Sequence, residues 1–178
     1  MSCISAVSIH SKGLDTLIQA YREFYLSFPG IRLVIAGDGR DRKRFEAMVM
    51  QLPAQIKANI EIPGWVSGDR KAEVIRQALF VVVPSRHEVQ PISVLEAMAC
   101  GKAILVSNIP ELHQVVEQRA GIAFEAGDPV SLARSMKTLA AREDLREMGQ
   151  RGRDWVKNYT WERIALRFEE FLLSVRAR

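Results

Sequence analysis

Two glutamates, Glu88 and Glu96, form the residue pair with the clearest chemical potential, and they lie eight positions apart. The pattern places Glu88 in a polar loop after an apolar strand and Glu96 in a short helix. A carboxylate on that helix can accept two hydrogen bonds at once, which suits the hydroxyl groups of a sugar. Glutamates at this spacing are common, so an alternative stays open in which Glu88 is a solvated loop residue and Glu96 a surface helix residue.

The start of this short helix favours the binding of an anion. Proline is preferred at the first helical position, where its missing N–H would have no partner, and we assign Pro91 to that position. The amides of Ile92 and Ser93 then point out of the helix end, where the positive end of the helix dipole attracts phosphate. Glu96 follows Ile92 by four residues and lies one turn along the same face, and Gly101 is suited to end the helix.

The composition indicates one domain with a full core, because the chain has 178 residues and 48% of them are apolar. The net charge of +4 favours anionic partners only weakly. Two cysteines, Cys3 and Cys100, give no disulfide framework, so we expect a reducing, cytoplasmic compartment. No apolar run approaches the roughly 20 residues of a membrane span, and the N-terminus lacks a signal-peptide pattern. Because a strand begins almost at once, we expect the chain to be a fragment.

Strand and helix patterns alternate along the chain. Apolar runs typical of buried strands occur at 4–8, 31–36, 60–62, 79–83, 103–106 and 121–124. Apolar residues recur at helical spacing between them, and the tail from 129 to 176 is helical, with Asp128 as a cap. This alternation predicts an α/β fold: a Rossmann-like, doubly wound parallel sheet with C-terminal helices. Ligands bind such sheets at the carboxyl ends of the strands, so the turns after the strands are candidate sites.

A glycine turn follows the second strand, at Gly37 and Gly39. It is not a dinucleotide fingerprint, because Arg42 stands where the third glycine would be. We expect the turn to let the backbone pass close to a ligand or to the neighbouring loop. No histidine or cysteine cluster has metal-ligand spacing, so we expect no metal site. The histidines are isolated from one another, and His87, beside Glu88, is the one that merits a test.

Several longer motifs resemble the C-terminal half of a retaining glycosyltransferase of family 4, which has the GT-B architecture of two Rossmann-like domains. The resemblance covers nearly the whole chain. It rests on KGLDTLIQAY from position 12, LVIAGDG from 33, GWVS from 64, VVVPS from 81, E-x7-E with EAMACGK from 88 to 102, MGQRGRDWV from 148 and YTWERIA from 159. It implies that residues 1–178 form the donor-binding domain, and that the N-terminal acceptor domain is absent from this chain.

The resemblance implies a nucleoside-diphosphate sugar as the donor substrate, with no further cofactor and no metal. Glu96 is expected to bind the ribose hydroxyls of the nucleotide. Glu88 is expected to contact the transferred sugar and to position it at the reacting carbon. Lys12 is expected to pair with the diphosphate, where a flexible point charge suits the negative charge that develops on the leaving group.

Backbone groups complete the implied donor site. The backbone of Val66 is expected to hydrogen-bond the base. The amides of Ile92 and Ser93 are expected to meet phosphate oxygens, in agreement with the argument from the helix start. Gly37 and Gly39 are expected to bring backbone close to the donor.

Two positions depart from the family pattern and leave a second interpretation open. Val7 stands where the family usually has an arginine that pairs with the diphosphate, and Pro91 stands where it often has glycine. In the alternative interpretation the domain is a degenerate, non-catalytic nucleotide-sugar-binding or scaffold module; a sugar-nucleotide epimerase of the same architecture is less favoured by the E-x7-E motif. The family indicates synthesis of polysaccharide or lipid-linked glycan. The C-terminal arginines allow a peripheral contact with the inner face of the membrane.

Overall fold

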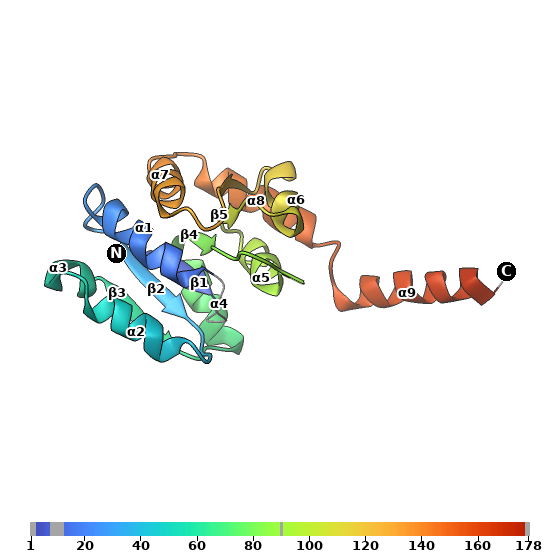
Figure 1. Cartoon of the computed structure of the whole chain (residues 1–178). Helices are drawn as coiled ribbons and strands as arrows, with labels where there is room; N and C mark the ends of the chain where they lie inside the picture. The colour runs from blue at the N-terminus through green and yellow to red at the C-terminus, as the bar shows by residue number, and fades with distance from the viewer. Residues whose placement is uncertain (1–2, 8–12, 90, 177–178) are drawn as a thin grey trace.

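The computed structural model describes residues 3–7, 13–89 and 91–176. Six strands form one parallel sheet in the order β3-β2-β1-β4-β5-β6 (Figure 1). The strands are β1 (Cys3–Val7), β2 (Arg32–Ala36), β3 (Ile60–Gly64), β4 (Ala78–Val83), β5 (Ile104–Ser107) and β6 (Gly121–Phe124). The chain builds outward from β1 to β3 and then restarts on the other side of β1 with β4. The predicted doubly wound sheet is therefore confirmed, and its switch point lies between β1 and β4.

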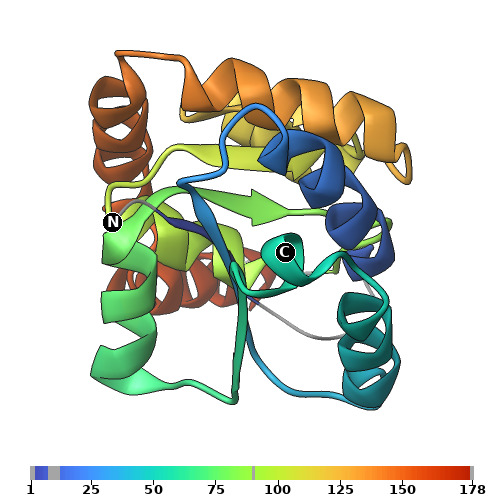
Figure 2. The same ribbon diagram turned by 90° about the vertical axis from the view of Figure 1, so that its left-hand side faces the viewer.

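Helices cover both faces of the sheet, as Figure 2 shows. Alternate side chains of a strand point to opposite faces, so an apolar strand presents apolar side chains on both faces for helices to bury. On β4, Phe80 and Val82 belong to one apolar core, whereas Val81 and Val83 belong to the other. The first core receives side chains from α1 (Leu14–Tyr25), α2 (Arg42–Met50), α3 (Ala54–Lys57) and α7 (Pro129–Ala140). The second receives them from α4 (Gly68–Gln77), α5 (Ile92–Ala99) and α6 (His113–Glu117), and α8 (Leu145–Val156) packs on α5.

The predicted cap at Asp128 is confirmed, whereas the residue before α2 makes no comparable cap. The Asp128 carboxylate accepts hydrogen bonds from the amides of Val130 at 2.8 Å and Ser131 at 3.2 Å, and Pro129 is the first helical residue. Asp41 precedes α2, but its side chain makes no capping hydrogen bond. Its backbone φ of −90° and ψ of 3° differ from the extended conformation that lets a capping side chain reach back to the helix amides.

The last helix, α9 (Trp161–Arg176), projects away from the sheet in Figure 1. All its described side chains, from 161 to 175, are exposed. They include a run of large apolar residues, with Phe168, Phe171 and Leu172 each more than half exposed. The core of the domain is therefore complete without α9. In the part of the chain that the structure describes, no helix is long and apolar enough to cross a membrane.

Candidate functional site at the switch point of the sheet

The switch point brings the start of α1 against the loop that follows β4. Gly13 directly precedes α1 and has φ of +86°, a left-handed conformation that favours glycine. A Cβ atom at Gly13 would lie only 1.9 Å from the carbonyl oxygen of Pro84, the first residue after β4. Both segments follow or adjoin the carboxyl ends of strands, where doubly wound sheets bind ligands. Lys12 lies outside the described residues, so its role stays a prediction.

Glu88 is buried in this loop and is not a solvated residue. Only 6% of Glu88 is exposed, and the Ser85 hydroxyl donates a hydrogen bond of 2.6 Å to Glu88 Oε1. A carboxylate is costly to bury unless it is hydrogen-bonded, so the loop must hold Glu88 in a defined orientation. The alternative that Glu88 is a solvated loop residue is therefore wrong. His87 beside it is largely exposed and lies 3.4 Å from Glu111 Oε1, measured from its Nδ1.

Arg86 ties the same loop to the first turn of α1. Its Nη2 donates hydrogen bonds to Asp15 Oδ2 at 2.9 Å and to Thr16 Oγ1 at 3.2 Å. Burial by itself would raise the pKa of Asp15, but the hydrogen bonds from Arg86 and from the Thr16 amide outweigh it, so the pKa lies below its ordinary value. Asp15 is thus ionised at neutral pH, and a charged pair connects α1 to the loop that carries Glu88.

The helix after this loop, α5, begins one residue later than the sequence suggested. Pro91 is the residue before the helix, and Ile92 is the first helical residue. The reason is that the amides of Val94 and Leu95 both donate to the Pro91 carbonyl, at 2.9 and 3.3 Å, which makes Pro91 the start of the hydrogen-bond ladder. The assignment of Pro91 to the first helical position was therefore wrong. The amides of Ile92 and Ser93 still lie ahead of the first intrahelical hydrogen bonds, as the anion-site argument requires.

Glu96 lines a cavity between α4 and α5 and is paired with a lysine. Lys71 Nζ on α4 lies 2.8 Å from Glu96 Oε1 and 2.6 Å from Oε2. The cavity has a volume of about 460 Å³, and both side chains contribute to its wall together with Gly68 and Arg153. Glu96 is half-buried and ion-paired, which differs from the alternative of a free surface helix residue.

The turn after β2 packs against the end of β3. The amide of Gly37, whose φ is +140°, donates a hydrogen bond of 2.8 Å to the Gly64 carbonyl. The predicted close approach of this turn to a neighbouring loop is confirmed. Val66 is buried, whereas the preceding Trp65 is 71% exposed. The hydrogen bond of the Val66 backbone with a base stays a prediction, as does the ligand contact of Gly39.

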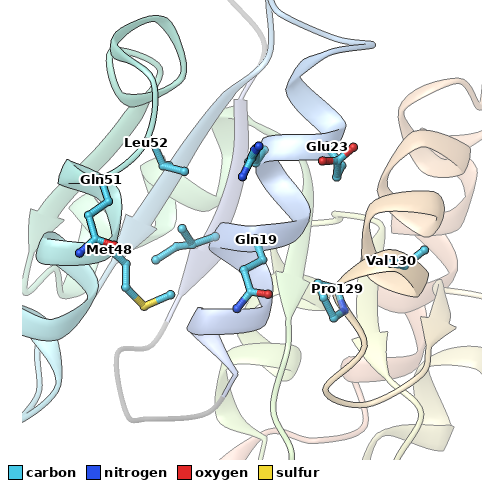
Figure 3. Close-up of a pocket in the computed structure, with 9 residues that line it drawn as sticks. Gln19, Glu23, Met48, Gln51, Leu52, Pro129 and Val130 are labelled. Carbon is cyan, nitrogen blue, oxygen red and sulfur yellow. The ribbon is translucent and has the colours of Figure 1, made fainter.

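A second cavity of about 420 Å³ lies between α1, α2 and α7 (Figure 3). Its wall includes Gln19, Glu23 and Met48, together with Pro129 and Val130 at the start of α7. Of the predicted donor-binding residues that the structure describes, none contributes to its wall. Within the described ranges no group of three or more histidine, cysteine or acidic residues gathers closely enough to bind a metal.

Three supporting residues were not found by sequence reasoning: Ser85, Arg86 and Lys71. Ser85 and Arg86 stand within the motif that contains Glu88, so their position in sequence was a usable signal. Lys71 lies 25 residues before its partner Glu96, on another helix. No local pattern in the sequence connects these two residues.

The chain belongs to the group 1 glycosyltransferases, whose family model matches residues 3–155. It is 29% identical over 160 residues to an uncharacterized glycosyltransferase of Methanocaldococcus jannaschii, a match that covers 89% of this chain and 43% of that protein. It is also 29% identical over 170 residues to the D-inositol 3-phosphate glycosyltransferase of Segniliparus rotundus, covering 93% of this chain and 37% of the relative. The chain thus spans less than half the length of these curated relatives.

Solved structures give the same assignment of the fold. Sucrose-phosphate synthase from Thermosynechococcus elongatus superposes with a TM-score of 0.80 at 25% identity, over 97% of this chain and 45% of that one. The C-terminal domain of a group 1 glycosyltransferase from Francisella tularensis superposes with a TM-score of 0.74 at 24% identity, over 88% of this chain and 85% of that one. The predicted GT-B resemblance is confirmed, and this chain is a C-terminal Rossmann-like domain of that architecture.

Proposed function

We propose that this chain is the donor-binding domain of a retaining glycosyltransferase that moves a sugar from a nucleoside-diphosphate sugar to a glycan or lipid-linked acceptor. One observation carries the proposal: neighbouring residues hold both glutamates of the E-x7-E motif in defined orientations. Glu88 is buried and held by Ser85, and Glu96 lines a cavity of about 460 Å³. A carboxylate costs free energy to bury unless it is hydrogen-bonded or paired, so both arrangements favour a functional role over a purely structural one.

In the proposed site the three parts of the donor meet three parts of the chain. Glu96 accepts hydrogen bonds from the ribose, and the start of α5, with the amides of Ile92 and Ser93, meets the diphosphate. Glu88 orients the transferred sugar. Catalysis is then mainly electrostatic, because the helix amides, with Lys12, stabilise the charge that develops on the departing diphosphate.

The acceptor site is proposed to lie on an N-terminal domain outside these residues. Two observations support this: relatives are more than twice as long as the matched region, and the apolar side chains of α9 stay exposed on this domain. A relative from Mycobacterium tuberculosis is described as a GDP-mannose-dependent mannosyltransferase, and one from Salmonella typhimurium as a lipopolysaccharide N-acetylglucosaminetransferase. Because such relatives differ in donor, we leave the base and the sugar to experiment.

Isothermal titration calorimetry with UDP, GDP and ADP tests the proposal. We expect micromolar binding of one of the three, lost in Glu96→Ala and retained in Glu143→Ala, an exposed glutamate in the loop before α8. The protein without its acceptor domain should transfer no sugar to a simple acceptor. If the wild-type chain binds none of the three nucleotides, the alternative of a degenerate scaffold module is favoured instead.

A further inference from the structure

The Lys71–Glu96 pair has a geometry that goes beyond a surface ion pair. The ammonium of Lys71 lies within 2.8 Å of both carboxylate oxygens, and the two side chains are only 26% and 34% exposed. Its hydrogen bond goes to Oε1. Oε2 is in close ionic contact at 2.6 Å, yet it is buried and accepts no hydrogen bond from the residues that the structure describes. Both oxygens of the carboxylate are therefore held against the same ammonium.

This arrangement restricts the glutamate without exhausting its acceptor capacity. An unrestrained glutamate side chain samples several rotamers, and fixing it costs conformational entropy. A lysine anchored on the neighbouring helix meets this cost before a ligand arrives. Each carboxylate oxygen has two lone pairs, so an ion pair with one ammonium leaves acceptor sites for two hydroxyl groups.

The wall of the same cavity contains other cations besides Lys71. Besides Lys71 and Glu96 it contains Gly68, at the start of α4, and Arg76 and Arg153. Arg76 and Arg153 lie in the same cavity wall, but neither forms an ion pair with Glu96 among the described residues. Lys71 is thus the cation that sets the orientation of this carboxylate.

We propose that Lys71 is a positioning residue that holds the Glu96 carboxylate ready to accept hydrogen bonds from the two ribose hydroxyls of the donor nucleotide. This inference rests on the proposed function of Glu96. Lys71 acts through Glu96 rather than by touching the diphosphate, so its contribution depends on the presence of those hydroxyls. A residue that bound phosphate directly would contribute equally with or without them.

The experiment compares each of UDP, GDP and ADP with its 2′,3′-dideoxy form by calorimetry on this chain. The variants are Lys71→Met, which keeps the length of the side chain, and Lys71→Arg, which keeps its charge. Arg70→Met, an exposed cation of the same helix that does not contribute to the cavity wall, is the matched control. Thermal unfolding of every variant separates a loss of binding from a loss of folding, and Lys71→Gln replaces Lys71→Met if the latter does not fold.

We expect Lys71→Met to weaken binding of the ribonucleotide about tenfold, near the lower end of what charge-assisted hydrogen bonds contribute. Binding of the dideoxy form should change less than about twofold on the same scale. Lys71→Arg should restore most of the affinity, and Arg70→Met should leave the wild-type affinity unchanged. In a Glu96→Gln background, Lys71→Met should have no further effect.

Three outcomes would overturn the inference. Equal loss of affinity for the ribo and dideoxy forms would mean that Lys71 contacts phosphate or base directly. Tighter binding by Lys71→Met would mean that the ion pair blocks the site. A loss that persists in the Glu96→Gln background would show that Lys71 does not act through Glu96. Absence of nucleotide binding by the wild-type chain is a separate result, because it removes the proposed function as well.

Discussion

The contact between Gly13 and Pro84 allows a sharp test of how the site is assembled. Replacing Gly13 by alanine places a methyl group 1.9 Å from the Pro84 carbonyl oxygen, whereas real Cβ contacts essentially never fall under 3.0 Å. The obstacle is backbone rather than the flexible end of a side chain, so the loop after β4 or the start of α1 must move. Since that loop carries Glu88, the substitution should disturb both stability and the site.

The magnitude follows from two costs and one gain. Alanine in the left-handed region costs about 1–2 kcal/mol, and forced overpacking costs about 1–3 kcal/mol. The lower entropy of an unfolded chain with alanine offsets about 0.4–1 kcal/mol. We therefore expect Gly13→Ala to lower the free energy of unfolding by about 2–4 kcal/mol, which moves the urea midpoint by about 1–2 M.

Two other glycines separate the costs in the same urea assay. Gly68 has φ of +54°, and nothing lies within 4 Å of the position that an alanine methyl group would take, so Gly68→Ala tests backbone conformation alone, at about 1 kcal/mol. Gly30 has neither positive φ nor a close neighbour, so Gly30→Ala should leave the midpoint unchanged or raise it slightly. If Gly13→Ala and Gly68→Ala unfold at the same urea concentration, the collision with Pro84 plays no part and the reasoning fails.

Two further predictions concern the supports of the same loop. Ser85→Ala removes the hydrogen bond to the buried Glu88 carboxylate, and we expect it to lower the free energy of unfolding in urea by about 1–2 kcal/mol. Relative to wild type, the variant should lose more affinity for a nucleotide sugar than for the corresponding nucleoside diphosphate. Unchanged unfolding and binding would contradict a supporting role for Ser85. Because the pKa of Asp15 is lowered in the folded state, its stabilising contribution is present above the ordinary carboxyl pKa and is lost as pH falls through the lower folded value. Asp15→Asn should therefore reduce stability by about 0.5–1 kcal/mol at neutral pH, since Arg86 is half-exposed, and the difference from wild type should vanish in strong acid; a difference that persists there would refute the assignment.

The fold could be predicted from the sequence because most of its strands and helices have a recognisable local pattern of apolar residues. Each strand of the sheet is a short apolar run, and the observed bounds lie within two residues of the expected ones. The helix α3 (Ala54–Lys57) was missed because four residues are too few to show helical periodicity. The start of α5 was misplaced because proline is compatible both with the residue before a helix and with the first helical residue.

The site could be predicted only in part, because its functional residues have a local sequence pattern and the residues that support them do not. Glu88 and Glu96 were identified by residue type and context, which a sequence contains directly. Their supports depend on contacts across the fold: Arg86 and Asp15 are 71 residues apart, and Lys71 and Glu96 lie on separate helices. Such pairs become visible only when the order of strands is known, since β1 must lie next to β4 for α1 to meet the loop.

The supports of the two glutamates come from opposite sides of the switch point. The Glu88 loop is attached to the start of α1 through Gly13 and the Arg86–Asp15 pair, on one face of the sheet. Glu96 is attached through Lys71 to α4, which packs on the other face. Groups without shared partners usually contribute independently to free energy. The two ends of the proposed site are therefore supported separately, and we expect a change in the loop that carries Glu88 to affect the sugar end while the nucleotide end stays intact.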